Sequence, residues 1–176
     1  MASSDLGLPF ERGNTYSDGG LVTMTSSTAE HLLGKVFQTT DSNGELLKLR
    51  CVRADAALTD VGGKTVSYTS GKIGKNVDAL CNSTGEVSSV IDDEYATKDI
   101  TQYDIFYVVE EGDVVAKAET DLDADDAIMA HASDTVAQAT AGSYVIGVAN
   151  EADGTTTSGY ASIHVCGGLK PSDPAS

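Results

Sequence analysis

The sequence predicts a mainly β fold, a small antiparallel β-barrel or sandwich that follows an extended N-terminal arm. Runs of about six residues rich in Val, Ile, Thr and Tyr recur along the chain, and clusters of Gly, Asp and Asn separate them. This rhythm is typical of all-β sandwiches and barrels. The clearest runs lie at 104–113, 142–149 and 159–168, and acidic turns join them. We therefore expect successive strands through the C-terminal half of the chain.

A β-hairpin is predicted between residues 34–40 and 45–53. Asn43 and Gly44 lie between these runs, and both residue types tolerate the positive φ of a tight turn. In the second run, successive side chains would point to opposite faces of the strand. One face carries Leu46, Lys48, Arg50 and Val52, and the other carries Leu47, Leu49, Cys51 and Arg53. This alternation predicts one buried face and one largely solvated face.

Further strands are predicted at 21–25 and 64–69. The segment from Asp104 to Val109 is apolar on both faces after its first residue, which indicates the central strand of a sheet. Gly112 and Asp113 predict a turn into another strand at 114–119. Residues 122–132 fit either a helical turn opened by an Asp cap or a strand entered through an acidic turn, and we favour the strand.

Three regions follow from composition. Residues 1–20 have few apolar anchors, which predicts a flexible N-terminal arm, with simple disorder as the alternative. Residues 21–168 form the β-rich domain, either as one unit or as two small β subdomains divided near 95–101. Residues 169–176 are too polar and proline-rich to pack and predict a disordered tail. The arm carries an apolar patch that we expect to bind a partner, formed by Leu6, Leu8, Pro9 and Phe10.

The net charge restricts the partners. The chain has 27 acidic and 11 basic residues and a formal charge of -16. Such a charge opposes binding to nucleic-acid phosphates or to an anionic membrane and favours a basic partner. The first ten residues lack the basic and apolar segments of a signal peptide, and no run approaches the ~20 apolar residues that cross a bilayer. We expect a soluble protein made in a cytoplasm.

No catalytic, cofactor-binding or metal-binding residues are predicted, and we expect that the chain is not an enzyme. Cys51, Cys81 and Cys166 are odd in number and lack a CxxC pair, so we expect free thiols. The histidines, at 31, 131 and 164, have no metal-ligand spacing. A β-fold enzyme whose active-site residues are scattered along the chain remains an alternative.

Two motifs come close to known sites and fail. Gly63-Lys64-Thr65 lacks the earlier glycine of a phosphate-binding loop, because Leu58 stands there. The acidic run at 121–126 is not an EF-hand, because Asp126 replaces its glycine and Ala132 its glutamate. A weak cation site at this run or at 92–94 remains open, and a solvated acidic turn is the alternative.

The order of these elements from residue 34 to 168 resembles that of the capsid decoration, or cement, proteins of tailed bacteriophages. The resemblance covers about three quarters of the chain, and it is carried by Gly34-Lys-Val-Phe, Asn43-Gly44, the run 49–58, the run 103–113 and Tyr144-Val-Ile-Gly-Val-Ala149. It implies a virion protein without a cofactor, made in the host cytoplasm and bound as a trimer to the major capsid protein on the capsid exterior. Its flexible arm would dock on a neighbour.

The alternative function is a carbohydrate-binding or surface-binding β module of a virion appendage. Such a module uses exposed aromatic side chains, against which sugars stack. The chain has no Trp, seven Tyr and three Phe, which makes sugar stacking the weaker hypothesis.

Overall fold

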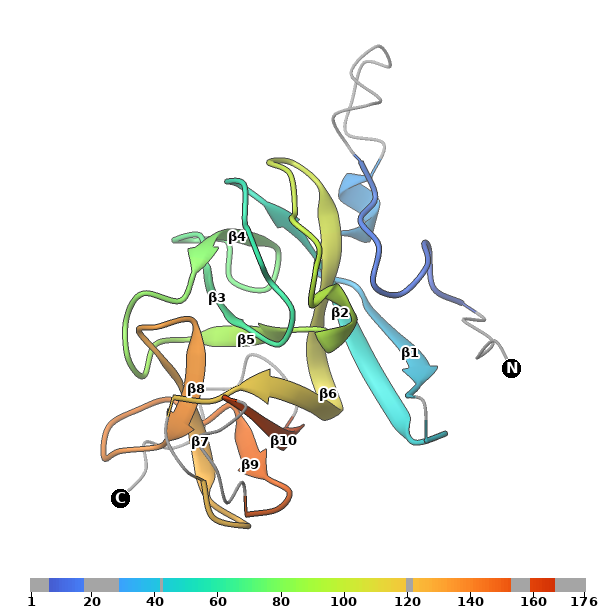
Figure 1. The fold of residues 1–176 in the computed structure, drawn as a ribbon. Helices are drawn as coiled ribbons and strands as arrows, with labels where there is room; N and C mark the ends of the chain where they lie inside the picture. Colours follow the sequence, from blue (N-terminus) through green and yellow to red (C-terminus); the bar gives the residue numbers. More distant parts are fainter. Residues whose placement is uncertain (1–6, 18–28, 42, 120–121, 153–158, 167–176) are drawn as a thin grey trace.

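The computed structural model describes residues 7–17, 29–41, 43–119, 122–152 and 159–166. This part of the chain is mainly β, which confirms the predicted fold class (Figure 1). Apart from two single-turn 3₁₀-helices, η2 (Glu30–Leu32) and η3 (Asp93–Tyr95), its regular elements are strands: β1 (Val36–Thr40), β2 (Leu46–Ala54), β3 (Thr65–Tyr68), β4 (Asn76–Leu80), β5 (Ser88–Ile91), β6 (Ile105–Lys117), β7 (Ala127–His131), β8 (Thr135–Gln138), β9 (Gly147–Ala149) and β10 (Tyr160–Val165). No helix among the described residues has the length and apolar character needed to span a membrane.

The first half of the fold is a closed ring of strands. Hydrogen bonds connect β2, β4, β3, β5 and β6 in this order, and β6 pairs again with β2. All these pairings are antiparallel except the short one between β2 and β4. Closure pairs strands that would otherwise be edges and encloses a small core. This barrel core consists of Val52, Ala54, Leu58, Val61, Val66, Tyr68, Val77, Ile91, Tyr95, Ile100, Phe106 and Val108.

A second ring uses the other end of β6. From Gly112 onward β6 pairs with β10, and the sheet continues through β9 and β7 to β8. A parallel bridge between Ala118 and Val136 returns from β8 to the residue that follows β6. The two rings therefore share one strand. They meet within β6 rather than near residues 95–101, where the alternative of two subdomains put the division.

Strand β6 is a single strand of 13 residues, so the turn predicted at Gly112 and Asp113 is wrong. Its pairing partners change there instead: residues 105–111 pair with β2, and 112–117 pair with β10. Gly112 has a φ of 126°, and the register with β2 shifts between Lys48 and Leu49, so an irregularity in the strand replaces the turn. The predicted central position of 104–109 is confirmed, since residues 105–109 are buried on both faces.

The predicted hairpin is confirmed. Strands β1 and β2 pair antiparallel, and the N–H of Gly44 donates to the carbonyl oxygen of Asp41 at 3.2 Å. Gly44 has a φ of 86°, the conformation expected of a glycine in this turn. Burial alternates along β2 up to Cys51 as predicted, but Val52 is also buried because it points into the barrel core. The favoured strand within 122–132 is β7.

A larger core lies outside the barrel and is shared by both rings. Side chains of β2 and β6 contribute Leu47, Leu49, Tyr107 and Val109, and the second ring adds Ile128, Val136, Ala149 and Ile163. Leu8, Phe10 and Tyr16 pack against it from the N-terminal segment.

The N-terminal segment differs from the flexible arm predicted for residues 1–20, because residues 7–17 pack on the domain. Tyr16 forms a bridge with Ile105, with hydrogen bonds of 2.8 and 2.9 Å between their main chains. The ring of Phe10 stacks on that of Tyr107 at a centroid distance of 4.3 Å. Burial of these aromatic rings fixes the segment. The predicted strand at 21–25 and the tail at 169–176 lie outside the described residues.

Candidate functional site

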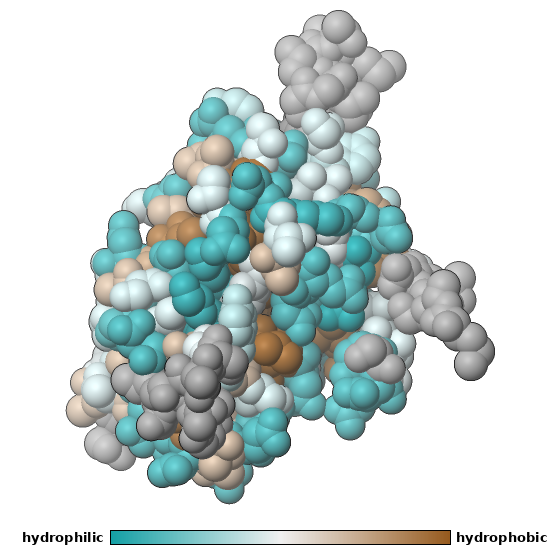
Figure 2. Space-filling model, viewed as in Figure 1, coloured by the Kyte–Doolittle hydropathy of each residue, from teal (hydrophilic) through white to brown (hydrophobic). Residues whose placement is uncertain are grey.

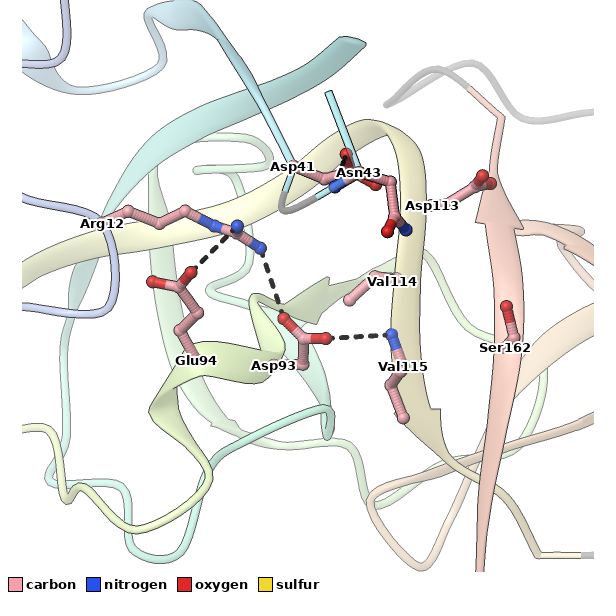
Figure 3. A pocket seen from close by; sticks show the side chains of 9 residues that line it. All are labelled: Arg12, Asp41, Asn43, Asp93, Glu94, Asp113, Val114, Val115 and Ser162. Carbon is pink, nitrogen blue, oxygen red and sulfur yellow. Dashed lines mark hydrogen bonds and ion pairs between the residues drawn. The ribbon is translucent and has the colours of Figure 1, made fainter. Parts of the chain in front are cut away.

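A surface pocket of about 360 Å³ lies where the N-terminal segment, the β1–β2 turn, η3, β6 and β10 meet. Figure 3 shows its charged groups on opposite sides, with Arg12, Asp93 and Glu94 across from Asp113. Val114 and Val115 supply the apolar part of the wall. The complete lining is Arg12, Asp41, Asn43, Asp93, Glu94, Asp113, Val114, Val115 and Ser162.

Arg12 compensates the acidic group at residues 92–94. Its guanidinium donates to both carboxylate oxygens of Asp92, at 2.9 and 2.7 Å, and lies 3.0 Å from a carboxylate oxygen of Glu94. Burial lowers the pKa of Arg12, but the hydrogen bond of Asp92 and the charges of Asp92, Glu94 and Asp93 together raise it by more, so the group stays charged. This acidic group was one of the two candidate cation sites, and a side chain of the protein itself already neutralises part of it.

Asp92 is fully buried. Burial raises the pKa of its carboxyl to about 6, against the hydrogen bond and the charge of Arg12, which lower it. Asp93 lies next to it at the pocket and joins two elements. One of its oxygens accepts from Arg12 at 3.3 Å, and the other accepts from the N–H of Val115 at 3.3 Å (Figure 3). The pair thus fixes both η3 and the N-terminal segment against β6.

Asp113 dominates the opposite side of the pocket. A carboxylate oxygen of Asp113 lies 2.7 Å from Nδ1 of His164 and accepts from Asn150 at 3.1 Å. Burial raises the pKa of Asp113, but the hydrogen bonds of His164, Asn150 and Glu45 lower it by more, so it lies below its ordinary value. The hydrogen bond between Glu45 and Asp113, together with the negative charge of Asp113, raises the pKa of the exposed Glu45. These two carboxyl groups titrate as a pair.

The arrangement suits recognition of positive charge. Four carboxylates and one amide face a shallow opening that is lined partly by valine, and one guanidinium offsets only part of the negative charge. Within the part of the chain that the structure describes, no group of three His, Cys, Asp or Glu side chains is arranged to hold a metal ion.

In the second candidate cation site, at 121–126, the carboxylate of Asp126 accepts hydrogen bonds from the protein itself. Asp126 accepts from the N–H of Asp123 at 2.9 Å and from the amide of Gln138 at 2.8 Å. Asp121 lies outside the described residues. These contacts make the turn an internally hydrogen-bonded acidic loop.

The three cysteines are free thiols. Cys51 and Cys81 are buried, and burial raises the pKa of Cys51 to about 12 and that of Cys81 to about 11. Cys166 is exposed. High thiol pKa values make the two buried cysteines poor nucleophiles.

The predicted partner-binding residues are only partly accessible. Pro9 is exposed, whereas Leu8 and Phe10 are half-buried against the larger core. Leu6 lies outside the described residues. Their role in binding a partner stays a prediction.

Sequence reasoning missed the pocket itself. Arg12 and Asp92 lie 80 positions apart, and Asp113 was placed in a turn rather than within a strand. The acidic run at 92–94 is visible in the sequence, but its partner Arg12 belongs to no local motif, so only the packing of the N-terminal segment could bring this group together.

The fold has a likeness among solved structures. A scan of family models and a search of curated proteins gave no match. Among solved structures, the chain is similar to the N base of head fiber gp8.5 in bacteriophage phi29, with 18% identity and a TM-score of 0.43. The match covers 70% of this chain and 98% of the other.

Proposed function

We propose that this chain is a structural protein of a bacteriophage virion, which binds the outer surface of the capsid and stabilises contacts between subunits of the major capsid protein. The observation that supports the proposal is the double-ring β body, in which β6 belongs to both rings and residues 105–109 of β6 are buried on both faces. A protein that clamps its neighbours needs such a preformed shape, because ordering a flexible chain on binding costs free energy.

The surface chemistry supports the same role. Figure 2 shows a largely hydrophilic face with small hydrophobic patches, and the formal charge is -16. A basic region on the outer face of the capsid would complement this charge, and the same charge opposes binding to nucleic acid or to an anionic membrane. Contacts repeated over a closed lattice would turn a modest interface per copy into a large total stabilisation.

The location follows from the role. The chain would be made in the host cytoplasm and added to the capsid exterior, without a cofactor and without enzymatic activity. The resemblance to decoration proteins implies a trimer. Native mass spectrometry with and without a chelator tests this state, and a chelator-sensitive oligomer would make the acidic turns cation ligands.

The main test is made on virions of the phage that encodes the chain. We expect the protein in purified particles and immunogold labelling of it on the capsid. Particles that lack it should release their DNA at a lower temperature. Its absence from purified particles, or labelling of the tail alone, would contradict the proposal.

The role of the N-terminal segment needs a deletion that respects the packing. Removing residues 2–12 would take away Phe10 and Arg12, which contact the core and Asp92. Deleting residues 2–7 instead removes Leu6 and leaves these contacts in place. We expect weaker binding to capsids with unchanged thermal stability of the isolated protein, and deletion of 169–176 is the matched control. Unchanged capsid binding would show that Leu6 is not part of the docking segment.

One observation favours the alternative of a carbohydrate-binding or surface-binding module. Tyr103, Tyr144 and Tyr160 are exposed, at 53%, 38% and 41%. Exposed tyrosines can stack against sugars. Binding to a glycan array that is lost on Tyr103→Ala, Tyr144→Ala or Tyr160→Ala, together with no affinity for capsids, would establish this alternative instead.

A further inference from the structure

Among the described residues, strand β1 has a partner strand along one edge and none along the other. That partner is β2, and Figure 1 shows β1 at the periphery of the molecule. The main-chain N–H of Cys51 donates to the carbonyl oxygen of Lys35, and the N–H of Asp41 donates to the carbonyl oxygen of Glu45. The odd-numbered residues of this segment therefore point their main-chain N–H and C=O groups toward β2. The N–H and C=O groups of successive residues point to opposite edges of a strand. Val36, Gln38 and Thr40 therefore direct their N–H and C=O groups outward, where another strand could pair with them.

This edge lacks the usual protection against pairing. Native sheets block an open edge with charged side chains, proline or a bulge. Strand β1 reads Val-Phe-Gln-Thr-Thr, and its register with β2 is regular throughout. Val36, Gln38 and Thr40 are exposed. In a chain of formal charge -16, an uncharged strand of five residues lets another chain add without placing a carboxylate of the strand itself against it.

The residues that flank β1 suggest which chain adds there. Lys35 precedes the strand and Asp41 follows it, so its two ends carry opposite charges. An antiparallel copy centred on Gln38 places Val36 opposite Thr40. It also places Lys35 of each copy opposite Asp41 of the other, on the same face of the sheet. Oppositely charged cross-strand pairs stabilise a sheet, and this register produces two of them.

We propose that two copies of this chain pair through their β1 strands, antiparallel and about a two-fold axis at Gln38. The interface is isologous and closes at two subunits, so it predicts a dimer rather than the trimer that the resemblance implies. One added strand buries less area than a standard interface, and the net charge opposes association, so the dimer forms weakly and reversibly. The inference is independent of the proposed role on the capsid.

Disulfide trapping tests the register directly. In this pairing the two Gln38 Cα atoms lie about 5.5 Å apart, within the range that a disulfide spans. Two Thr40 Cα atoms lie about 14 Å apart, because each is offset from its equivalent by four residues. Gln38→Cys and Thr40→Cys are therefore compared as full chains in a Cys166→Ser background, so that the exposed native thiol does not react.

We expect the Gln38→Cys variant to form the covalent dimer at least ten times faster than the Thr40→Cys variant. Mixing the Val36→Cys and Thr40→Cys variants should give the mixed dimer faster than either homodimer. Equal rates for the Gln38→Cys and Thr40→Cys variants, or no covalent dimer from the former, would overturn the proposal.

Sedimentation equilibrium gives the second test without a covalent bond. Gln38→Pro removes an outward N–H, which an edge strand tolerates, and should lower the dimer association constant about tenfold, whereas Gln38→Ala keeps the main-chain donor. Lys35→Glu should also weaken the dimer, and by less when Asp41 is replaced by Asn, which keeps an oxygen for the hairpin turn. A protein that stays monomeric at millimolar concentration, a trimer, or a dimer unaffected by Gln38→Pro would contradict the pairing.

Discussion

Arg12 compensates a carboxylate that lies inside the protein. The side chain of Asp92 has no solvent exposure, and that of Arg12 is only 10% exposed. Taking both charges out of water is costly, and their mutual attraction and hydrogen bonds offset that cost. Removal of one partner leaves the other buried and unpaired. The pair therefore makes the packing of residues 7–17 a condition for the stability of the domain.

At this scale we predict that Arg12→Met lowers the free energy of unfolding by about 3 kcal/mol at pH 8. The loss should be smaller at pH 5. Without Arg12, the pKa of Asp92 rises above its present value of about 6, so the folded protein binds a proton that the unfolded chain releases. Stability then falls as the pH rises through this window. Urea denaturation at the two pH values measures both effects.

The matched control is Lys48→Met, which removes an ion pair of 2.7 Å with Glu111. The side chains of that pair are 27% and 43% exposed, so its loss should cost less than about 1 kcal/mol at either pH. If both substitutions cost the same, or if the effect of Arg12→Met did not depend on pH, the account of Asp92 would be wrong.

Among the elements, β6 depends on Gly112. At this residue the strand stops pairing with β2 and starts pairing with β10. The φ of Gly112 is 126°, a value that residues other than glycine rarely adopt. A Cβ atom there would lie 2.9 Å from the carbonyl oxygen of Leu46 and 3.0 Å from a methyl carbon of Leu47. Both the backbone conformation and the space therefore require glycine.

We predict that Gly112→Ala lowers the free energy of unfolding by about 3 kcal/mol, from backbone strain and close contact together. Gly44→Ala is the control, because Gly44 also has a positive φ but nothing within 4 Å of a Cβ. It should cost only the backbone part, about 1 kcal/mol. Chemical denaturation of both variants checks the difference, and an equal cost would show that the contact with β2 relaxes freely.

Gly112 also shows where prediction from sequence stopped. A glycine followed by an aspartate is the usual mark of a turn, and the sequence was interpreted in that way. The same two residue types serve a strand that changes partners, because Gly112 tolerates the irregular φ and Asp113 accepts from His164 and Asn150. These partners lie 51 and 37 positions away, and no local pattern reports contacts over such separations. The hairpin at Asn43 and Gly44 was predicted correctly because its contacts are local.

For the molecule as a whole, the net charge opposes compaction. A formal charge of -16 on 176 residues creates self-repulsion in the folded state, which salt screens. We predict that raising NaCl from 20 to 200 mM raises the midpoint of thermal unfolding. A relief of about 1 kcal/mol corresponds to roughly 3 °C for a chain of this size. Differential scanning calorimetry measures the shift.

Potassium chloride should act as sodium chloride does, because screening depends on ionic strength and not on the cation. An unchanged or lower midpoint in salt would mean that ion pairs such as that of Arg12 outweigh the repulsion. A rise produced by millimolar calcium alone would instead point to a cation site in an acidic turn.

The sequence by itself determined the β class, the hairpin around Asn43 and Gly44, the central place of residues 104–109 and the negative charge, because each depends on residues close in the chain or on composition alone. The tertiary structure decided the rest. It joined the two rings through β6, packed residues 7–17 on the core and brought Arg12 to Asp92. It also gave β1 no partner other than β2 within the described part of the chain. These features depend on which distant segments pack against each other and bury their apolar surface. Patterns of neighbouring residues in one sequence do not contain that information.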